Sequence, residues 1–161
     1  AAARTSSASH RATTLTAALL AGDTLYLGHV GDSRAYLLRH GRLTQLTEDH
    51  STAAEQVRRG LVPPDEAAHP MDNALTQVIG LEGPIDPFIG SLSLEEGDRL
   101  LLCTDGLHGF LDDRTIAAIV QRAGTGGTVD ALMARTIDMG STDNVTALLV
   151  SFESPETSHQ G

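Results

Sequence analysis

The sequence has little aromatic content, with no tryptophan and only 3% aromatic residues. Its core must therefore be built largely from leucine, isoleucine, valine and alanine. There is one cysteine, Cys103, so an internal disulfide is excluded. Its place at the end of an apolar run predicts a buried thiol rather than a reactive one. A chain without disulfides suits a reducing compartment, and we expect a cytoplasmic protein.

Basic residues are also scarce, since 11 lysines and arginines face 21 aspartates and glutamates, for a formal net charge of -10. Nucleic acids and anionic membrane surfaces would be repelled by such a chain. No apolar stretch approaches the roughly 20 residues of a membrane-spanning helix. The segment Ala1–His10 lacks the apolar centre of a signal peptide. We therefore expect no nucleic-acid partner and no insertion into a membrane.

The 161 residues contain 40% hydrophobic side chains, enough for one domain with a true core. Strand-like segments separated by short turns fill the first part of the chain. They are Ala12–Leu20, Thr24–Val30, Arg34–Arg39 and Arg42–Thr47. Such short turns predict consecutive antiparallel hairpins, that is, a β-meander.

A short helix is predicted next, over Ser51–Arg59, with Ser51 as its N-cap and Gly60 at its end. Beyond it, the pairs Pro63-Pro64, His69-Pro70 and Gly83-Pro84 favour a loop with short helical turns. This section resembles a flap. Two further strands, Asp86–Leu94 and Asp98–Cys103, flank a turn that begins with two solvated glutamates.

Two helices and a last strand are predicted in the final third. The first helix begins at Asp112 or Asp113 and runs to about Arg122, and the second covers Thr128–Met139 before a strand that ends at Phe152. Their predicted buried residues are Ile116, Ile119, Val120 and Ala123 in the first helix, and Val129, Leu132, Met133 and Ile137 in the second. The fold class is therefore α+β, with helices covering a mostly antiparallel sheet.

Three aspartates stand where apolar, strand-like runs meet turns. They are Asp32 in Gly-Asp-Ser-Arg, Asp105 in Thr-Asp-Gly and Asp143 in Thr-Asp-Asn. Buried strands would gather the three carboxylates at one edge of a sheet. Convergent carboxylates repel one another unless a hard divalent cation such as Mg²⁺ or Mn²⁺ binds between them. Taken one at a time, each aspartate is equally typical of a structural turn, and Asp32 keeps both interpretations.

Five motifs in fixed order resemble the metal-dependent serine/threonine protein phosphatases, the PPM or type 2C family, in their bacterial form. One such motif alone would be weak, but the ordered set is specific. The motifs are Thr13-Thr14-Leu15, Gly28-His29-Val30-Gly31-Asp32-Ser33-Arg34-Ala35-Tyr36, Leu46-Thr47-Glu48-Asp49-His50-Ser51, Leu102-Cys103-Thr104-Asp105-Gly106-Leu107 and Ser141-Thr142-Asp143-Asn144-Val145-Thr146.

The resemblance implies an antiparallel β-sandwich flanked by helices, with two Mn²⁺ or Mg²⁺ ions at one end. Asp105 and Asp143 match aspartates that ligate one of the paired ions. Asp32 matches an aspartate that, with the equivalent of Asp105, holds a weaker third ion in bacterial members. The implied activity is hydrolysis of phosphoserine and phosphothreonine in proteins by a metal-bound water, without a phosphoenzyme. The implied partners are phosphorylated proteins and a serine/threonine kinase system that phosphorylates them.

The chain departs from the family by an absence. Family members carry a phosphate-binding arginine, an Asn-Glu-Asp motif and an Asp-Gly-Met-Gly-Gly motif before the segment that matches Thr13-Thr14-Leu15, and none of these is present. We therefore expect a single partial phosphatase domain, equivalent to the C-terminal two-thirds, whose N-terminal strands and long helices are missing. Its parts would be a loose terminus at 1–11, a folded region at 12–153 and a tail at 154–161. The missing Asp-Gly-Met-Gly-Gly aspartate, which bridges the two metals in the family, predicts weak metal binding. The missing strands predict self-association through exposed sheet edges.

Three explanations of this absence stay open: a fragment of an active enzyme, one polypeptide of a divided domain, or a catalytically silent relative that serves as a regulatory or binding module. We favour the fragment, because a binding module has no physical need of metal-binding aspartates. An Asp-Gly-Met-Gly-Gly element upstream in the parent reading frame would discriminate between them.

Other polar residues receive structural interpretations. His29 is predicted to be a packed core histidine, and Arg34 to orient a neighbouring carboxylate. Asp49-His50 is predicted to close a turn before the Ser51 helix. His108 has two interpretations, a position near the metals or an exposed loop.

Overall fold

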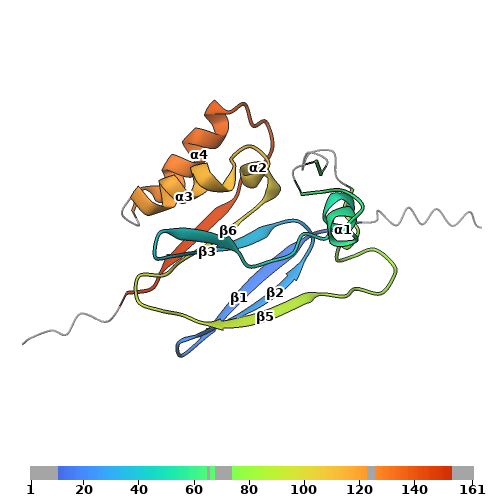
Figure 1. Ribbon diagram of the computed structural model, residues 1–161, viewed down its shortest axis with the longest axis horizontal. Helices are drawn as coiled ribbons and strands as arrows, with labels where there is room; N and C mark the ends of the chain where they lie inside the picture. The colour runs from blue at the N-terminus through green and yellow to red at the C-terminus, as the bar shows by residue number, and fades with distance from the viewer. Residues whose placement is uncertain (1–10, 65, 68–73, 123–125, 154–161) are drawn as a thin grey trace, which may run out of the picture.

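The computed structural model describes residues 11–64, 66–67, 74–122 and 126–153. This part of the chain forms three layers: two helices, a four-stranded sheet and a three-stranded sheet (Figure 1). The sheets are antiparallel, which confirms the α+β class and the sandwich. The ends predicted to be loose, 1–11 and 154–161, lie outside the described residues except for Arg11.

The three-stranded sheet has the order β1-β2-β5, with β1 at Leu15–Ala21, β2 at Thr24–Val30 and β5 at Phe88–Ser93. The β1–β2 hairpin turns at Gly22, whose φ of 63° suits glycine. The register pairs Leu19 with Tyr26, so both side chains lie on one face of the sheet.

The four-stranded sheet has the order β4-β3-β6-β7. Its strands are β4 at Arg42–Gln45, β3 at Arg34–Arg39, β6 at Arg99–Cys103 and β7 at Ala147–Ser151. The central strands β3 and β6 are nearly continuous apolar runs because both of their faces are covered.

The predicted β-meander is wrong in its connectivity. The hairpins β1–β2 and β3–β4 form as expected, but β2 and β3 lie in different sheets and pair with β5 and β6, which are more than fifty residues away. The turn at Gly31–Ser33 therefore carries the chain from one sheet to the other. Residues facing inward in both sheets drive this choice, because stacking the two hairpins buries apolar faces that a flat meander would expose.

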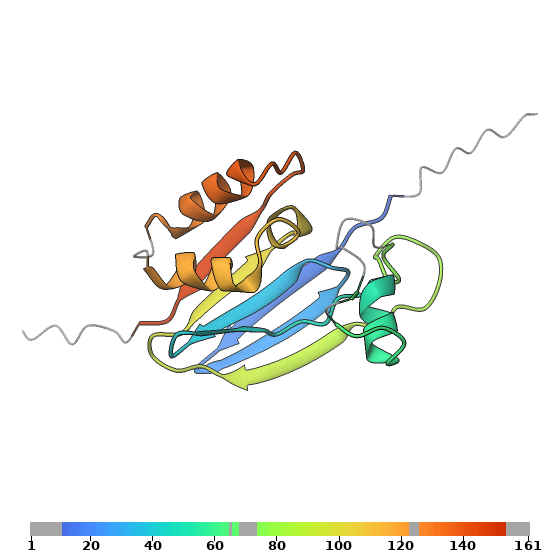
Figure 2. The same ribbon diagram turned by 45° about the horizontal axis from the view of Figure 1, so that its top comes forward.

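Four helices are described: α1 at Thr52–Arg58, α2 at Asp105–His108, α3 at Asp113–Arg122 and α4 at Thr128–Asp138. Helix α1 begins as predicted, with the Ser51 side chain accepting a hydrogen bond from the Ala54 amide at 3.2 Å. Helices α3 and α4 lie over the four-stranded sheet, and α1 lies apart at one end of the sandwich (Figures 1 and 2). The short helix α2 was not predicted, since it consists of one turn.

The predicted N-cap of α3 and most of its predicted buried residues agree with the structure, whereas α4 agrees less well. Asp112 caps α3 by accepting from the Thr115 amide at 2.7 Å. Ile116 and Val120 are buried as expected, whereas Ala123 lies outside the described residues. In α4 the buried line is Thr128, Leu132 and Thr136, so the prediction that Ile137 is buried is wrong. The buried face of α4 is therefore rotated by one position from the predicted one.

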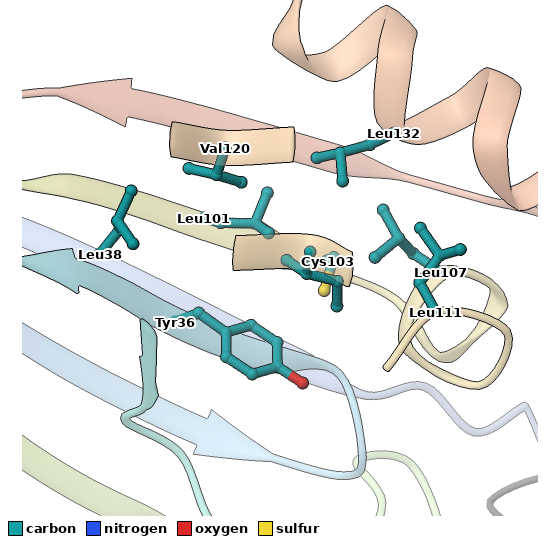
Figure 3. Close-up of a cluster of buried hydrophobic side chains, with 9 residues drawn as sticks. Tyr36, Leu38, Leu101, Cys103, Leu107, Leu111, Val120 and Leu132 are labelled. Carbon is teal, nitrogen blue, oxygen red and sulfur yellow. The ribbon is translucent and has the colours of Figure 1, made fainter. Parts of the chain in front are cut away.

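One hydrophobic cluster fills the space between the helices and the four-stranded sheet (Figure 3). Tyr36, Leu38, Leu101 and Cys103 come from the sheet, and residues of α2, α3 and α4 complete it. Cys103 is buried as predicted, and burial raises the pKa of its thiol to about 12. The thiol is therefore protonated and unreactive at neutral pH.

A second cluster lies between the two sheets and includes Leu25, Leu27, Ala35 and Leu100. The opposite face of the three-stranded sheet is exposed. Leu19 on β1 is 66% exposed and Ile89 on β5 is 72% exposed. No helix of the described residues is long and apolar enough to cross a membrane.

Candidate metal-binding end of the sandwich

The three predicted aspartates lie in turns that follow or precede strands at one end of the sandwich. Asp32 lies between β2 and β3, Asp105 is the first residue of α2, and Asp143 lies in the turn before β7. Gly31 has a φ of 114°, and a Cβ there would collide with Thr14. Glycine at position 31 therefore allows the tight turn that carries Asp32 from β2 to β3.

Asp32 and the Asp105 helix are in direct contact. The Nε2–H of His108, on α2, donates to the backbone carbonyl of Asp32 at 2.9 Å. Burial raises the pKa of Asp32, and the Asp105 carboxylate raises it further. A carboxyl group whose ionisation is opposed by burial and by a neighbouring carboxylate is a place where a cation would be stabilised.

The Asp143 turn packs against the Asp105 turn through the backbone. The Ser141 hydroxyl donates to the carbonyl of Gly106 at 3.3 Å. A Cβ at Gly106 would collide with the carbonyl of Asn144, so these two turns approach as closely as a glycine permits.

The side chains of Asp105 and Asp143 are exposed and each stabilises its own turn. One oxygen of Asp105 accepts from the Gly106 amide at 2.9 Å, and one oxygen of Asp143 accepts from the Asn144 amide at 2.7 Å. Both aspartates therefore stabilise turns, as the structural interpretation predicted. The metal-ligand roles of Asp105, Asp143 and Asp32 stay predictions.

The donor chemistry suits a hard cation, but the donor number is low. Carboxylate oxygens are the ligands that Mg²⁺ and Mn²⁺ prefer. Within the described ranges, however, no three histidine, cysteine, aspartate or glutamate side chains come close enough to form a metal site. The described residues therefore fit part of a metal site and do not complete one.

Arg34 orients a carboxylate, as predicted, and its partner is Asp49. The guanidinium donates to both oxygens of Asp49, with distances of 2.7 to 3.1 Å, and also to the hydroxyl of Tyr36 at 2.9 Å. Gln45 donates to Asp49 at 3.0 Å. Asp49 therefore joins the segment before α1 to β3 through a bidentate ion pair. The prediction that Asp49 closes a turn is incomplete, because it did not include this pair.

His29 is a packed core histidine, as predicted. Its Nδ1 lies 2.9 Å from the Thr16 hydroxyl, and its Nε2 donates to the Gly31 carbonyl at 2.9 Å. His50, which lies beside it, accepts from the Gly31 amide at 3.2 Å. Burial lowers the pKa of both histidines, so neutral imidazoles hold the turn that carries Asp32.

His108 is not an exposed loop residue; it lies on α2 against Asp32, one of the three predicted metal ligands. It is 7% exposed, and its Nδ1 is buried with no hydrogen-bond partner among the described residues. Burial lowers its pKa to about 4, so the ring is neutral, with the proton on Nε2 and a lone pair on Nδ1. A buried acceptor without a donor costs about 1–3 kcal/mol. The sequence gave no indication that His108 is buried against Asp32, apart from the apolar residues around it.

A cavity of about 600 Å³ opens beside this end of the sandwich. It lies between α1, the segment that follows β4, and α2, and its lining includes Asp32, Arg34, Glu48, Ala54, Val57 and His108. Asp32 therefore belongs both to the carboxylate turns and to the cavity wall.

Comparison with known proteins places these features in a family. The family model described as Protein phosphatase 2C matches residues 1–151. The serine/threonine phosphatase stp of Listeria monocytogenes is 36% identical over 140 residues, which cover 86% of this chain and 56% of that protein. The serine/threonine protein phosphatase PstP of Mycobacterium tuberculosis is 39% identical over 139 residues, which cover 85% of this chain and 27% of that protein.

Solved structures agree in fold. The S. agalactiae serine/threonine phosphatase superposes with a TM-score of 0.82 at 38% identity, covering 88% of this chain and 60% of that one. The catalytic domain of PstP in complex with two manganese ions superposes with a TM-score of 0.75 at 38% identity, covering 86% and 57%. The chain thus spans little more than half of the Listeria relative and of these structures. On the ordered motifs, the sandwich and these matches together, the chain belongs to the protein phosphatase 2C family.

Proposed function

We propose that this chain supplies part of the site of a metal-dependent phosphatase that hydrolyses phosphoserine and phosphothreonine in proteins. The observation that carries the proposal is the meeting of the Asp32 turn with the helix of Asp105. There, partial burial and the nearby Asp105 carboxylate both raise the pKa of the half-buried Asp32. Phosphorylated proteins are the substrates, with a serine/threonine kinase system upstream of them.

The proposed roles follow the family motifs. Asp105 and Asp143 hold one of two paired Mn²⁺ or Mg²⁺ ions, and Asp32 with Asp105 holds a weaker third ion. When bound, such ions lower the pKa of water and offset charge on phosphoryl oxygens. The PstP structure with two manganese ions supports this choice of metal.

The chain's own residues position these carboxylates. The neutral rings of His29 and His50 hold the Gly31 turn through its carbonyl and amide, and His108 holds the carbonyl of Asp32. Arg34 and Asp49 fix the first residue of β3, which follows the same turn. These contacts fix the backbone that carries Asp32 before any ion binds.

Manganese binding to the purified 161-residue chain tests the proposal. We expect weak binding by titration calorimetry, with a dissociation constant above micromolar, since a complete ligand set is not present among the described residues. Asp105→Asn and Asp143→Asn should abolish it, because each removes a charged oxygen donor. Asp130→Asn, an exposed carboxylate on α4, is the matched control and should leave binding unchanged. Micromolar binding that persists in both site variants would refute the assignment.

A regulatory or binding module without catalysis is the second candidate, and it is favoured by the absence of a three-residue metal cluster among the described residues. Phosphate release from a phosphothreonine peptide discriminates between the two. Manganese-dependent release that disappears in Asp105→Asn supports the enzyme. Absence of release, from this chain and from the parent reading frame extended through an Asp-Gly-Met-Gly-Gly element, supports the module.

A further inference from the structure

The turn that carries Asp32 is also held by two threonines at the start of the edge strand β1, which the proposed function leaves without a role. Thr14 belongs to the motif Thr13-Thr14-Leu15, and Thr16 is the second residue of β1. The side chains of both threonines reach Ser33, which directly follows Asp32 in the sequence. The beginning of β1 therefore forms one side of the Asp32 turn.

Thr14 holds the turn by its shape and by one polar contact. Its side chain fills the space beside Gly31, where a Cβ would collide with it. Its hydroxyl lies 3.0 Å from the hydroxyl of Ser33. The residues on both sides of Asp32 are thus in contact with one threonine.

Thr16 has two hydrogen-bond partners for one hydroxyl proton. The register of β1 and β2 places Thr16 opposite His29, and its hydroxyl oxygen lies 2.9 Å from the Nδ1 of His29. The same oxygen lies 3.1 Å from the carbonyl oxygen of Ser33, which can only accept. Because a hydroxyl group has a single proton, Thr16 donates to one of these partners at a time.

The protonation state of His29 decides which partner receives this proton. The Nε2 of His29 lies 2.9 Å from the Gly31 carbonyl and must carry hydrogen, because a carbonyl only accepts. In the neutral ring Nδ1 is therefore an acceptor, and the Thr16 hydroxyl donates to it. In the charged ring Nδ1 is a donor, so the Thr16 oxygen accepts from His29 and the Thr16 proton is donated to the carbonyl of Ser33.

The surroundings of His29 keep the ring neutral at pH 7. Its side chain is 2% exposed, and burial lowers the pKa of His29 from its usual value of about 6.5. The ring of His50, 5.2 Å away between centroids, also lowers this pKa. Strand β1 carries no charged residue, and the neighbour of His29 on β5 is Phe88. The groups that raise the pKa are the backbone of Gly31 and of Glu48 and the Asp49 carboxylate. The charged ring therefore forms only below pH 6.5.

We propose that Thr16 is a positioning residue for the Asp32 turn. One proton on His29 switches the Thr16 hydroxyl between the His29 ring and the carbonyl of Ser33. With His29 neutral, Thr16 ties β1 to the histidine alone, and with His29 charged it also ties β1 to the backbone that follows Asp32. Acid therefore adds a hydrogen bond between β1 and the turn. The importance of this switch for catalysis rests on the proposed function, whereas the switch itself needs no metal.

Nuclear magnetic resonance of the whole 161-residue chain, without metal and between pH 7 and pH 5, tests the proposal. The ¹⁵N shift of His29 Nδ1 reports the protonation of that nitrogen. The ¹³C shift of the Ser33 carbonyl reports whether this carbonyl accepts a hydrogen bond. We expect Nδ1 to be unprotonated at pH 7, and both signals to change with one midpoint below pH 6.5.

Thr16→Val and Thr44→Val provide a matched pair, because both replace a strand threonine by valine of similar shape and Thr44 is exposed on β4 in the other sheet. Thr16→Val removes the acceptor for the charged ring, so His29 should bind a proton about tenfold more weakly. The Ser33 carbonyl should then no longer follow the pH. Thr16→Ser keeps the hydroxyl and should restore both signals, and Thr44→Val should leave both as in the native chain. Circular dichroism establishes that the variants retain the fold.

His50 is the competing origin of a pH effect in this turn, since its Nδ1 accepts from the Gly31 amide at 3.2 Å. His29→Gln and His50→Gln separate the two histidines. We expect the pH dependence of the Ser33 carbonyl to disappear in His29→Gln and to persist in His50→Gln.

Three results would overturn the proposal. A proton on Nδ1 of the neutral His29 ring would show that the assignment of donors is wrong. An unchanged His29 midpoint in Thr16→Val would show that this hydroxyl does not act on the ring. A Ser33 carbonyl whose pH dependence is lost only in His50→Gln would assign the effect to the other histidine. Manganese titration of the native chain tests the proposed function separately, and its failure would change none of these three measurements.

Discussion

Strands β1 and β6 have similar apolar sequences but opposite environments. β6 lies between β3 and β7, with helices over one face and the second sheet over the other, so Leu100 and Leu101 are 1% and 0% exposed. β1 lies at the edge of its sheet, and Leu19 is 66% exposed. An apolar run therefore predicts a strand, but only its neighbours decide whether the strand is buried.

The comparison extends to the two outer faces of the sandwich. The four-stranded sheet is covered by α3 and α4 around a packed cluster (Figure 3). The outer face of the three-stranded sheet presents Leu19, Tyr26 and Ile89 to solvent. Such a patch is typical of a surface that another polypeptide covers. This exposed face is consistent with the predicted self-association, which stays a prediction.

The largest expected effect is a difference in stability between substitutions on the covered face and on the exposed face. Leu101→Ala should lower the free energy of unfolding by about 2–5 kcal/mol, because it leaves a cavity between the sheet and the helices. Leu19→Ala is the matched control, and it should cost about 0.5 kcal/mol or less. Urea unfolding followed by circular dichroism measures both. Equal losses would mean that β1 is buried in solution, for example against another copy.

A smaller effect concerns the link between the sheets at the end far from the aspartate turns. Arg39 on β3 donates to the carbonyl of Ser93, the last residue of β5, at 2.7 Å and to both oxygens of Asp98 at 2.6 and 2.9 Å. The Arg39 hydrogen bonds lower the pKa of Asp98. A lowered carboxyl pKa contributes stability above the unfolded pKa of about 3.9, and this contribution is lost as the pH falls through the folded value.

We therefore expect Asp98→Asn to be less stable than the native chain at pH 7, by less than the loss in Leu101→Ala. The difference should shrink at pH 3, which lies below the unfolded carboxyl pKa of about 3.9. Urea unfolding at the two pH values measures this, with Glu96→Gln in the neighbouring exposed turn as the control. If the difference in unfolding free energy stays constant with pH, the Asp98 side chain stabilises the fold by its packing and hydrogen bonds rather than by its charge.

The smallest effect is on association. Leu19→Lys places a charge on the exposed face, and we expect it to weaken any self-association about tenfold, as loss of one buried leucine contact predicts. Light scattering over a range of concentrations measures this, with Thr44→Lys on β4 as the matched control. If Leu19→Lys associates as the native chain does, the contact lies elsewhere on the molecule.

The local features of this protein could be predicted from its sequence because they depend on near neighbours. The positions of the strands, the Ser51 cap of α1 and the Asp112 cap of α3 follow from hydrophobic period and turn chemistry. So does the burial of Cys103, which lies in an apolar run. The ordered motifs indicated the family before any fold was known, since the motifs are short and contiguous.

The long-range features were decided only by the tertiary structure. Hydrophobic period does not state which strands pair, so the crossing of the chain between sheets at Gly31–Ser33 and the exposure of Ile137 were missed. The contact of His108 with the carbonyl of Asp32 joins residues 76 positions apart. The burial of His108 beside the cavity that α1 lines depends on how distant segments pack around it. That packing sums many weak contacts between distant segments, and no short stretch of sequence contains it.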